Sequence, residues 1–100
     1  MSYKLFIDDE RCPTTPDWMI ARTSYDAIWM VENYGMPTEI AFDHDLGGED
    51  TTMVFLKWLE QKLMEEFVAF PTNFKYSIHS QNPIGAKNIK LYMEDLLNFF

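Results

Sequence analysis

Short β-prone segments alternate with amphipathic helical patterns along this chain, and this alternation limits the folds available to it. The β-prone segments are residues 3–7, 18–21, 39–42 and 74–78. Apolar residues recur at helical spacing over about residues 25–34, over about residues 51–67, and from residue 83 to near the C-terminus. Such alternation predicts a parallel sheet, right-handed crossovers and helices on both faces of the sheet. We therefore expect a small three-layer α/β domain with a parallel sheet of about four strands.

The connection between the first two β-prone segments differs from the others. It contains Pro13 and Pro16, which lack an amide donor and disfavour helix in the residue before them. No crossover helix is expected there, so the second strand is predicted to be short or peripheral. The later helices carry boundary signals, because Thr23 and Asp26 have the capping-box spacing and Asn82 is a suitable N-cap.

The length and composition predict one soluble globular domain over residues 1–100. Of these residues 47% are hydrophobic and 16% are aromatic, which is enough to bury a core and is unlike a disordered segment. The sequence predicts no signal peptide, and no apolar run is long enough to span a bilayer. Cys12 is the only cysteine, so an internal disulfide is excluded and a cytoplasmic location is expected.

The charge of the chain restricts its partners. The formal net charge is −8 at pH 7, whereas nucleic-acid polymers are bound mainly by basic residues that displace counterions. This argues against long DNA or RNA as a partner. A small anionic ligand stays compatible with the charge, because a metal ion, a helix N-terminus or a few focused cations can attract phosphate locally.

Three of the β-prone segments end in polar clusters, which are the main functional signal. The clusters are Asp8-Asp9-Glu10-Arg11, Asp43-His44-Asp45 and His79-Ser80-Gln81-Asn82. The carboxyl ends of neighbouring parallel strands meet at one edge of a sheet, where open α/β sheets bind their ligands. We therefore predict that the three clusters form one site. Gly47 and Gly48 follow the second cluster and are expected to allow a sharp turn with positive φ.

Acidic side chains of the first two clusters are candidates for binding a divalent cation. Asp8 and Asp9, together with Asp43 or Asp45, would supply the hard carboxylate oxygens that bind Mg²⁺ or Mn²⁺. The alternative is that Asp9 and Glu10 merely cap the loop after the first strand. Acidic clusters at matching strand ends favour the metal or phosphate-related site.

His44 and His79 are the only histidines, and both follow predicted strands. Two histidines can divide general acid and base catalysis on a phosphate ester, because imidazole titrates near neutral pH. The alternative for each is a structural hydrogen bond to the neighbouring backbone. Their presence at the same predicted edge favours the functional interpretation.

Other residues near these strand ends are candidates for holding phosphate. The helix that begins after Asn82 presents backbone amides and a positive dipole end, and Gly85 and Lys87 lie in its first turns. Arg11 is the better-placed cation unless it pairs with a nearby acid, and Lys87 is otherwise a solvated side chain. Ser80 is either a phosphate-binding hydroxyl or a turn residue.

Four segments together resemble the cyclic-phosphate-processing receiver-like domain. The segments are Leu5 to Arg11, Trp18 with Ala21-Arg22-Thr23, Phe42 to Gly47, and His79 to Ala86. That family is similar to the receiver domains of response regulators, which have a flavodoxin-like fold, and is proposed to act on cyclic phosphate ends of RNA or on cyclic nucleotides. The resemblance implies a receiver-like fold and a small cyclic nucleotide or RNA-end cyclic phosphate as the partner.

The receiver analogy also implies roles for individual acids. Asp8 and Asp9 match the acidic pair after the first strand, and Asp43 matches the aspartate that accepts phosphate. A receiver's lysine after a fifth strand has no counterpart here, and His44 and His79 are additional. These departures favour cyclic-phosphate processing over aspartyl-phosphate signalling.

The leading hypothesis is a phosphoesterase-like domain that opens a cyclic phosphate, with Asp43, His44 and His79 as its catalytic residues and a divalent ion as its cofactor. One alternative is a non-catalytic binder that sequesters a cyclic nucleotide, as a phage protein acting against host immunity would. Another is a phosphoacceptor receiver domain. The sequence leaves the nucleotide, the metal and the oligomeric state open.

Overall fold

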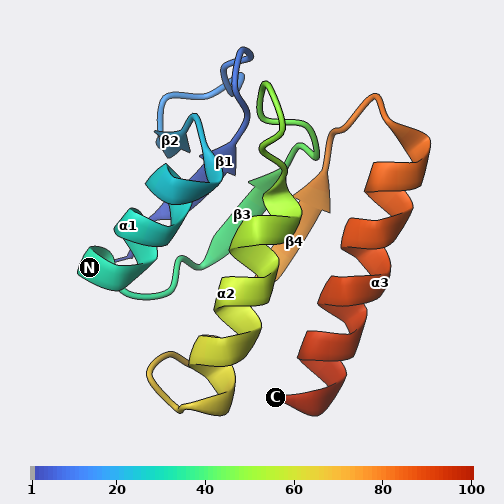
Figure 1. Cartoon of the computed structure of the whole chain (residues 1–100). Helices are drawn as coiled ribbons and strands as arrows, with labels where there is room; N and C mark the ends of the chain where they lie inside the picture. The colour runs from blue at the N-terminus through green and yellow to red at the C-terminus, as the bar shows by residue number, and fades with distance from the viewer. Residues whose placement is uncertain (1) are drawn as a thin grey trace.

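The computed structural model describes residues 2–100, which form four strands and three helices (Figure 1). In chain order these are β1 (Lys4–Ile7), β2 (Trp18–Ala21), α1 (Ser24–Tyr34), β3 (Glu39–Phe42), α2 (Thr52–Met64), β4 (Lys75–Ile78) and α3 (Pro83–Phe99). The predicted alternation of strands and helices is therefore confirmed. None of the helices within residues 2–100 has the length and apolarity required to cross a membrane.

The four strands form one parallel sheet in the order β2-β1-β3-β4. This is the order of a flavodoxin-like sheet without its fifth strand, and β2 is the edge strand that the proline-containing connection predicted. The register pairs Ile7 with both Ala21 and Phe42, and it pairs Phe42 with Ile78. The last residues of the four strands are therefore aligned. The next residue after each strand reaches the same edge of the sheet, and these residues are Asp8, Arg22, Asp43 and His79.

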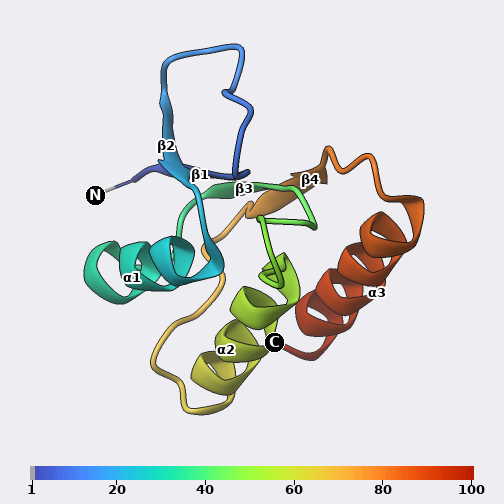
Figure 2. The same ribbon diagram turned by 45° about the horizontal axis from the view of Figure 1, so that its top comes forward.

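All three helices lie on one face of the sheet (Figure 2). The α/β class and the parallel sheet are confirmed, but the expected third layer is not observed within residues 2–100. The connection from β1 to β2 contains no helix, so only two crossovers contain helices. Both run in the same direction across the sheet, and right-handed crossovers of one direction place their helices on the same face. The third helix, α3, then packs beside α2.

The core lies between the sheet and this single helical layer. Its largest fully buried side chains include Leu5, Ile7, Ile40 and Phe42 from the strands and Phe55, Leu56, Leu59, Ile89 and Met93 from α2 and α3. Each such side chain contributes about 1.5–3 kcal/mol through burial. This core fixes the strands whose ends carry the polar clusters.

Side chains, rather than a helix, cover the centre of the opposite sheet face. The ring of Phe6 lies 5.9 Å from that of Trp18 and 4.6 Å from that of His79, which leaves Phe6 only 9% exposed. Lys4 lies over the Trp18 ring at 5.1 Å. A residue that follows β4 therefore helps to cover a residue of β1.

The helix boundaries follow the capping signals of the sequence. The Thr23 side chain accepts the Asp26 amide at 3.0 Å, and the Asn82 side chain accepts the Gly85 amide at 3.0 Å. Helix α2 ends at Met64, three residues before the expected end. Glu66 adopts a φ of 59° there, a left-handed conformation that does not continue a right-handed helix.

Candidate functional site

A polar cavity of about 530 Å³ lies at the edge where β1, β3 and β4 end. Side chains from all three predicted clusters and from the glycine turn surround it. Its lining residues are Asp8, Asp9, Glu10, Arg11, Asp43, Asp45, Gly47, Gly48, Ser80, Gln81 and Asn82. Both glycines of the turn have positive φ, 92° for Gly47 and 57° for Gly48, as their position predicted.

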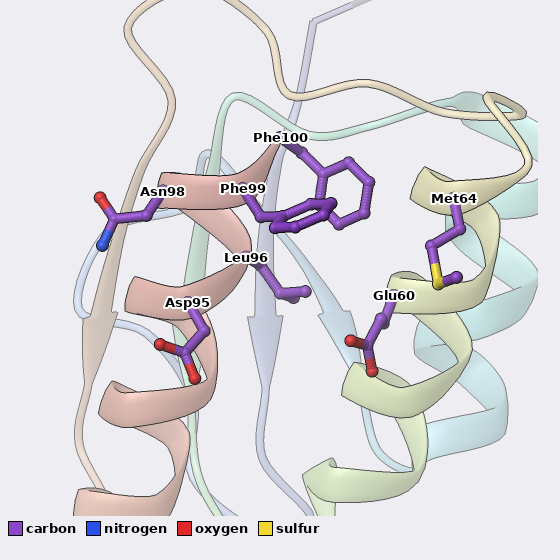
Figure 3. Close-up of a pocket in the computed structure, with 7 residues that line it drawn as sticks. All are labelled: Glu60, Met64, Asp95, Leu96, Asn98, Phe99 and Phe100. Carbon is purple, nitrogen blue, oxygen red and sulfur yellow. The ribbon is translucent and has the colours of Figure 1, made fainter.

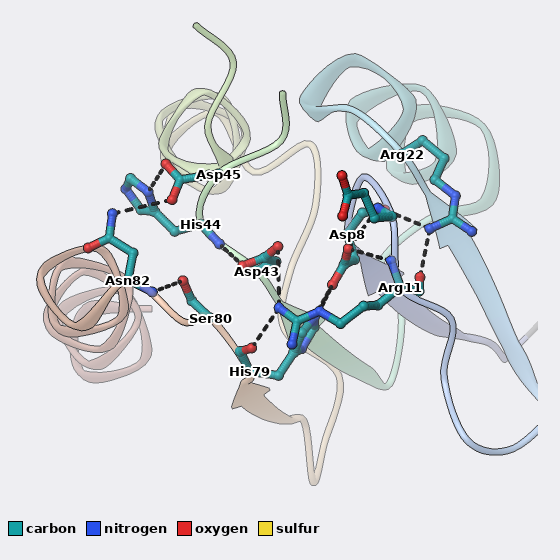
Figure 4. A network of polar contacts seen from close by, with 10 residues as sticks. Asp8, Arg11, Arg22, Asp43, His44, Asp45, His79, Ser80 and Asn82 are labelled. Atoms are coloured by element: carbon teal, nitrogen blue, oxygen red, sulfur yellow. Dashed lines mark hydrogen bonds and ion pairs between the residues drawn. The ribbon is translucent and has the colours of Figure 1, made fainter. Parts of the chain in front are cut away.

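Asp8 is the most deeply buried acid of this edge, with 1% of the residue exposed. Its Oδ1 accepts the backbone amides of Glu10 at 2.9 Å and of Arg11 at 2.8 Å. Its Oδ2 lies 3.0 Å from Nε2 of His79 and 3.2 Å from Nε of Arg11 (Figure 4). The carboxylate thus joins the loop after β1 to the end of β4.

Opposing influences act on the pKa of Asp8. Burial is the largest single influence and raises the pKa, because it disfavours the charged form. The amide hydrogen bonds from Glu10 and Arg11, the His79 hydrogen bond and the charge of Arg11 act in the other direction. Together they outweigh burial, so the pKa of Asp8 lies below its ordinary value and the group is anionic at neutral pH.

Arg11 extends from the same loop along the cavity toward the ends of β3 and β4. Besides its contact with Asp8, its Nη2 donates to the backbone oxygen of His79 at 3.1 Å and lies 3.7 Å from Oδ2 of Asp43. The side chain is 45% exposed. The cation predicted to bind phosphate is therefore in the cavity and is also paired with acids, as the alternative role for Arg11 proposed.

Asp43 and Asp9 complete an acidic group beside Arg11. Asp43 is 8% exposed, and its Oδ1 accepts the amide of His44 at 2.9 Å. One carboxylate oxygen from each of Asp8, Asp9 and Asp43 lies within 4.8 Å of the others. Asp45, the fourth predicted metal ligand, is not part of this group.

The donor type of these acids suits Mg²⁺ or Mn²⁺, but their present partners do not. Both oxygens of Asp8 already accept protein donors, and the Arg11 guanidinium contacts the carboxylates of both Asp8 and Asp43. A divalent ion on Asp8 and Asp43 would compete with that guanidinium. As the side chains stand, the acidic group does not fit a metal, and metal binding stays a prediction.

His44, Asp45 and Asn82 form a second group on the other side of Asp43 (Figure 4). Nδ1 of His44 lies 3.1 Å from Oδ1 of Asp45, and Nδ2 of Asn82 donates to Oδ2 of Asp45 at 3.3 Å. The His44 hydrogen bond, followed by that of Asn82, lowers the pKa of Asp45. The imidazole packs directly on Gly85, where a Cβ atom would lie 2.4 Å from Cγ of His44.

Neither predicted catalytic histidine belongs to the cavity lining. Each is bonded instead to an acid that lines the cavity, His79 to Asp8 and His44 to Asp45. The structure thus brings both histidines to the predicted edge of the sheet, but neither of them lines the cavity. Asp43 is the predicted catalytic residue that lines the cavity.

The residues predicted to hold phosphate divide in the same way. Arg11, Ser80 and Asn82 line the cavity, whereas Gly85 and Lys87 do not. The Gly85 amide is bonded to the Asn82 side chain, and Lys87 is exposed on α3. The Ser80 hydroxyl oxygen accepts the Asn82 amide at 3.1 Å, which leaves the hydroxyl hydrogen free to be donated.

Arg22 is a supporting residue that belongs to the segments of the family resemblance but was not assigned a role from the sequence. Its Nη1 donates to the backbone oxygens of Asp8 at 3.0 Å and Arg11 at 2.6 Å, so it holds the loop that carries both residues. The signal was its position directly after β2, at a fourth strand exit.

A second cavity, of about 540 Å³, lies far from these strand ends, between the C-terminal parts of α2 and α3 (Figure 3). Met64, Leu96, Phe99 and Phe100 give it a largely apolar lining, with Glu60 and Asp95 beside them. It contains none of the predicted site residues. Side chains from all three predicted polar clusters line the cavity at the strand ends instead.

The sheet order and an acidic cavity at the carboxyl edge define a receiver-like α/β domain. Residues 3–95 match the family described as the cyclic-phosphate processing receiver domain, so the chain belongs to that family. This confirms the resemblance seen in the four sequence segments. No match was found among curated proteins or among solved structures.

Proposed function

We propose that this domain binds a small cyclic phosphate in the polar cavity and opens the phosphate ring by hydrolysis. The observation that carries the proposal is the convergence of Arg11, Ser80 and Asp43 on one cavity at the carboxyl edge of the sheet. Family membership supports the substrate class. The cavity volume of about 530 Å³ is in the range of small-molecule sites, which favours a cyclic nucleotide or a single RNA end.

The charges of the cavity suit a cyclic phosphodiester better than its product. Arg11 uses Nε and Nη2 in its protein contacts, so Nη1 is the part with which a phosphate oxygen would pair. The Ser80 hydroxyl would donate a second hydrogen bond. Hydrolysis adds a second ionisable oxygen to the phosphate, and the nearby carboxylates then repel the more negative product. This repulsion favours product release.

The proposed reaction is an attack of water on phosphorus. Asp43 would accept the water proton as a general base while the bond from phosphorus to one ring oxygen breaks, and that oxygen takes up a proton. His44 and His79 are the residues predicted to move protons in this reaction, and one of them would protonate the leaving oxygen. Each ring uses one nitrogen to contact its acid, Nδ1 of His44 with Asp45 and Nε2 of His79 with Asp8. Because neither histidine lines the cavity, transfer from the second nitrogen to a ligand requires the ring or the ligand to move.

The test is incubation with 2′,3′-cyclic mononucleotides and cyclic oligonucleotides, in EDTA and with Mg²⁺ or Mn²⁺, followed by mass spectrometry of the products. We expect linear phosphomonoesters from the wild type. Asp43→Asn should lower turnover by about 10²-fold or more, because the base is removed. Lys75→Gln is the control, since Lys75 lies at the opposite end of β4 and is exposed. A folded protein that leaves the whole panel unchanged would exclude hydrolysis of these substrates.

The position of both histidines outside the cavity lining favours a second candidate, a binder that sequesters a cyclic nucleotide without turnover. The same panel can be titrated by calorimetry. Tight binding of an intact nucleotide, weakened by Arg11→Gln and unaffected by Lys75→Gln, would select this function. Binding followed by product formation would exclude it.

A further inference from the structure

The Arg11 guanidinium has an unusual location for a cation on an acidic edge. Nε contacts Oδ2 of Asp8 at 3.2 Å, and Nη2 lies 3.7 Å from Oδ2 of Asp43. These two carboxylates belong to the group that could otherwise hold a divalent ion. A protein cation therefore already contacts two of the three carboxylates that a metal ion would use.

The backbone of Arg11 is tied to the same place. Its amide donates to Oδ1 of Asp8 at 2.8 Å, and its carbonyl accepts Nη1 of Arg22 at 2.6 Å. The guanidinium also donates to the backbone oxygen of His79 at 3.1 Å. These contacts hold Arg11 from both ends, so its proximity to Asp8 is a consequence of the loop after β1.

Electrostatic repulsion makes Arg11 and a divalent metal ion competitors for the same carboxylates. Three carboxylates within 4.8 Å of one another repel, and a cation among them offsets that repulsion. The guanidinium supplies one positive charge and is only weakly hydrated. Mg²⁺, in contrast, must lose tightly bound water before it can bind the carboxylates. A divalent ion that bound Asp8 and Asp43 would meet a like charge at short range unless Arg11 moved out.

We propose that Arg11 is the resident cation of this edge and that it competes with divalent metal ions for Asp8 and Asp43. In the resting domain Arg11 occupies the carboxylates, and metal binds only by displacing it. The exposed part of the guanidinium gives it a route into solvent. This inference concerns the cavity of the proposed function, but metal binding is measured without any phosphate ligand, so either idea can fail alone.

The test is calorimetric titration of the full chain with MnCl₂ at fixed ionic strength. Arg11→Gln removes the competing charge and should bind Mn²⁺ at least about tenfold more tightly than the wild type. Lys75→Gln makes the same change in net charge at an exposed site far from the cavity, and it should bind within about twofold of the wild type. Equal affinities of wild type and Arg11→Gln would overturn the proposal.

A second comparison locates the metal that Arg11→Gln binds. Adding Asp43→Asn to Arg11→Gln should abolish the gain in affinity, whereas a gain that persists would place the ion elsewhere and contradict the proposal. Circular dichroism would check that each variant is folded. If Arg11→Gln is unfolded, Arg11→Lys serves instead, because an ammonium cannot bridge two carboxylates with a planar fork. It should bind Mn²⁺ more tightly than the wild type, and unchanged affinity would again overturn the proposal.

Discussion

The two histidines of this domain have similar sequence settings and different structural ones. Each follows a strand and each pairs with an aspartate. His79 pairs with Asp8, whose side chain is 1% exposed, and its ring stacks on Phe6 at 4.6 Å with an interplanar angle of 10°. His44 pairs with Asp45, its neighbour in sequence, whose side chain is 64% exposed.

The sequence separation and the burial of each pair decide how it contributes to the stability of the fold. His79 and Asp8 are 71 residues apart, so their bond connects β4 to the loop after β1. The bond between His44 and Asp45 joins consecutive residues, and solvent screens it. We expect the His79 pair to stabilise the fold and the His44 pair chiefly to orient the imidazole.

Replacing Asp8 should give the largest effect. Asp8→Ala removes the acceptor of two backbone amides, of the His79 ring and of Arg11. We expect a loss of about 2–3 kcal/mol in the free energy of unfolding, at or just below the lower limit for breaking a buried pair, because Arg11 is partly solvated. Urea denaturation at neutral pH in EDTA measures this loss.

The matched control for that experiment is Asp45→Ala. It removes the acid of the exposed pair and should cost less than about 1 kcal/mol. Losses of equal size from the two variants would contradict the distinction between the pairs. A folded Asp45→Ala protein also shows how stable the domain is when His44 lacks its acidic partner.

Gly85→Ala should give a smaller effect with a diagnostic sign. Alanine in place of glycine ordinarily stabilises a helix by up to about 1 kcal/mol. Here the new Cβ would lie 2.4 Å from Cγ of His44, so the ring must shift. We expect the clash to exceed the helical gain and to destabilise the domain by about 1 kcal/mol. Thermal or urea unfolding measures the change.

The second variant of this experiment removes the ring. In a His44→Ala background the clash is absent, so Gly85→Ala should become stabilising by about 0.5–1 kcal/mol. This reversal of sign would show that His44 and Gly85 are coupled by contact. Additive effects of the two substitutions would contradict the packing of the imidazole on Gly85.

The strands and the three polar clusters could be predicted from the sequence because the signals are local. Apolar β-prone runs that stop at ionisable residues mark strand ends, and Asn82 followed by Pro83 marks a helix start. The one-sided helical layer could be predicted only in part. Pro13 and Pro16 exclude a helix from the first crossover, but the direction of the remaining crossovers depends on the strand order, which no local signal specifies.

The pairing of side chains at the site could not be predicted, because it depends on register. Phe42 lies opposite both Ile7 and Ile78, and this alignment places His79 within reach of Asp8. Alternation along β4 gives a partial signal: Ile78 faces the core, so His79 must face the other side, where Phe6 lies. The choice of Asp8 as the partner of both Arg11 and His79 follows only from the folded geometry.

The acid stability of the domain should show the smallest effect. The pKa of Asp8 lies below its ordinary value of 3.8 in the folded chain, so the unfolded chain binds its proton first as the pH falls. The ionised group therefore stabilises the fold fully above about pH 4–5, and this contribution is lost as the pH falls through the folded-state pKa. Unfolding measured from about pH 6 to about pH 2.5 should show less acid sensitivity for Asp8→Asn than for the wild type.

Asp45→Asn separates this linkage from the general effect of acid on an acidic protein. The pKa of Asp45 is also lowered, by His44 and Asn82, but its side chain is largely exposed and solvent screens those contacts. Its variant should follow the wild-type pH dependence closely. If Asp45→Asn flattened the acid dependence as much as Asp8→Asn, the exposed pair would be as strongly coupled to folding as the buried one. His44 would then have a structural role equal to that of His79.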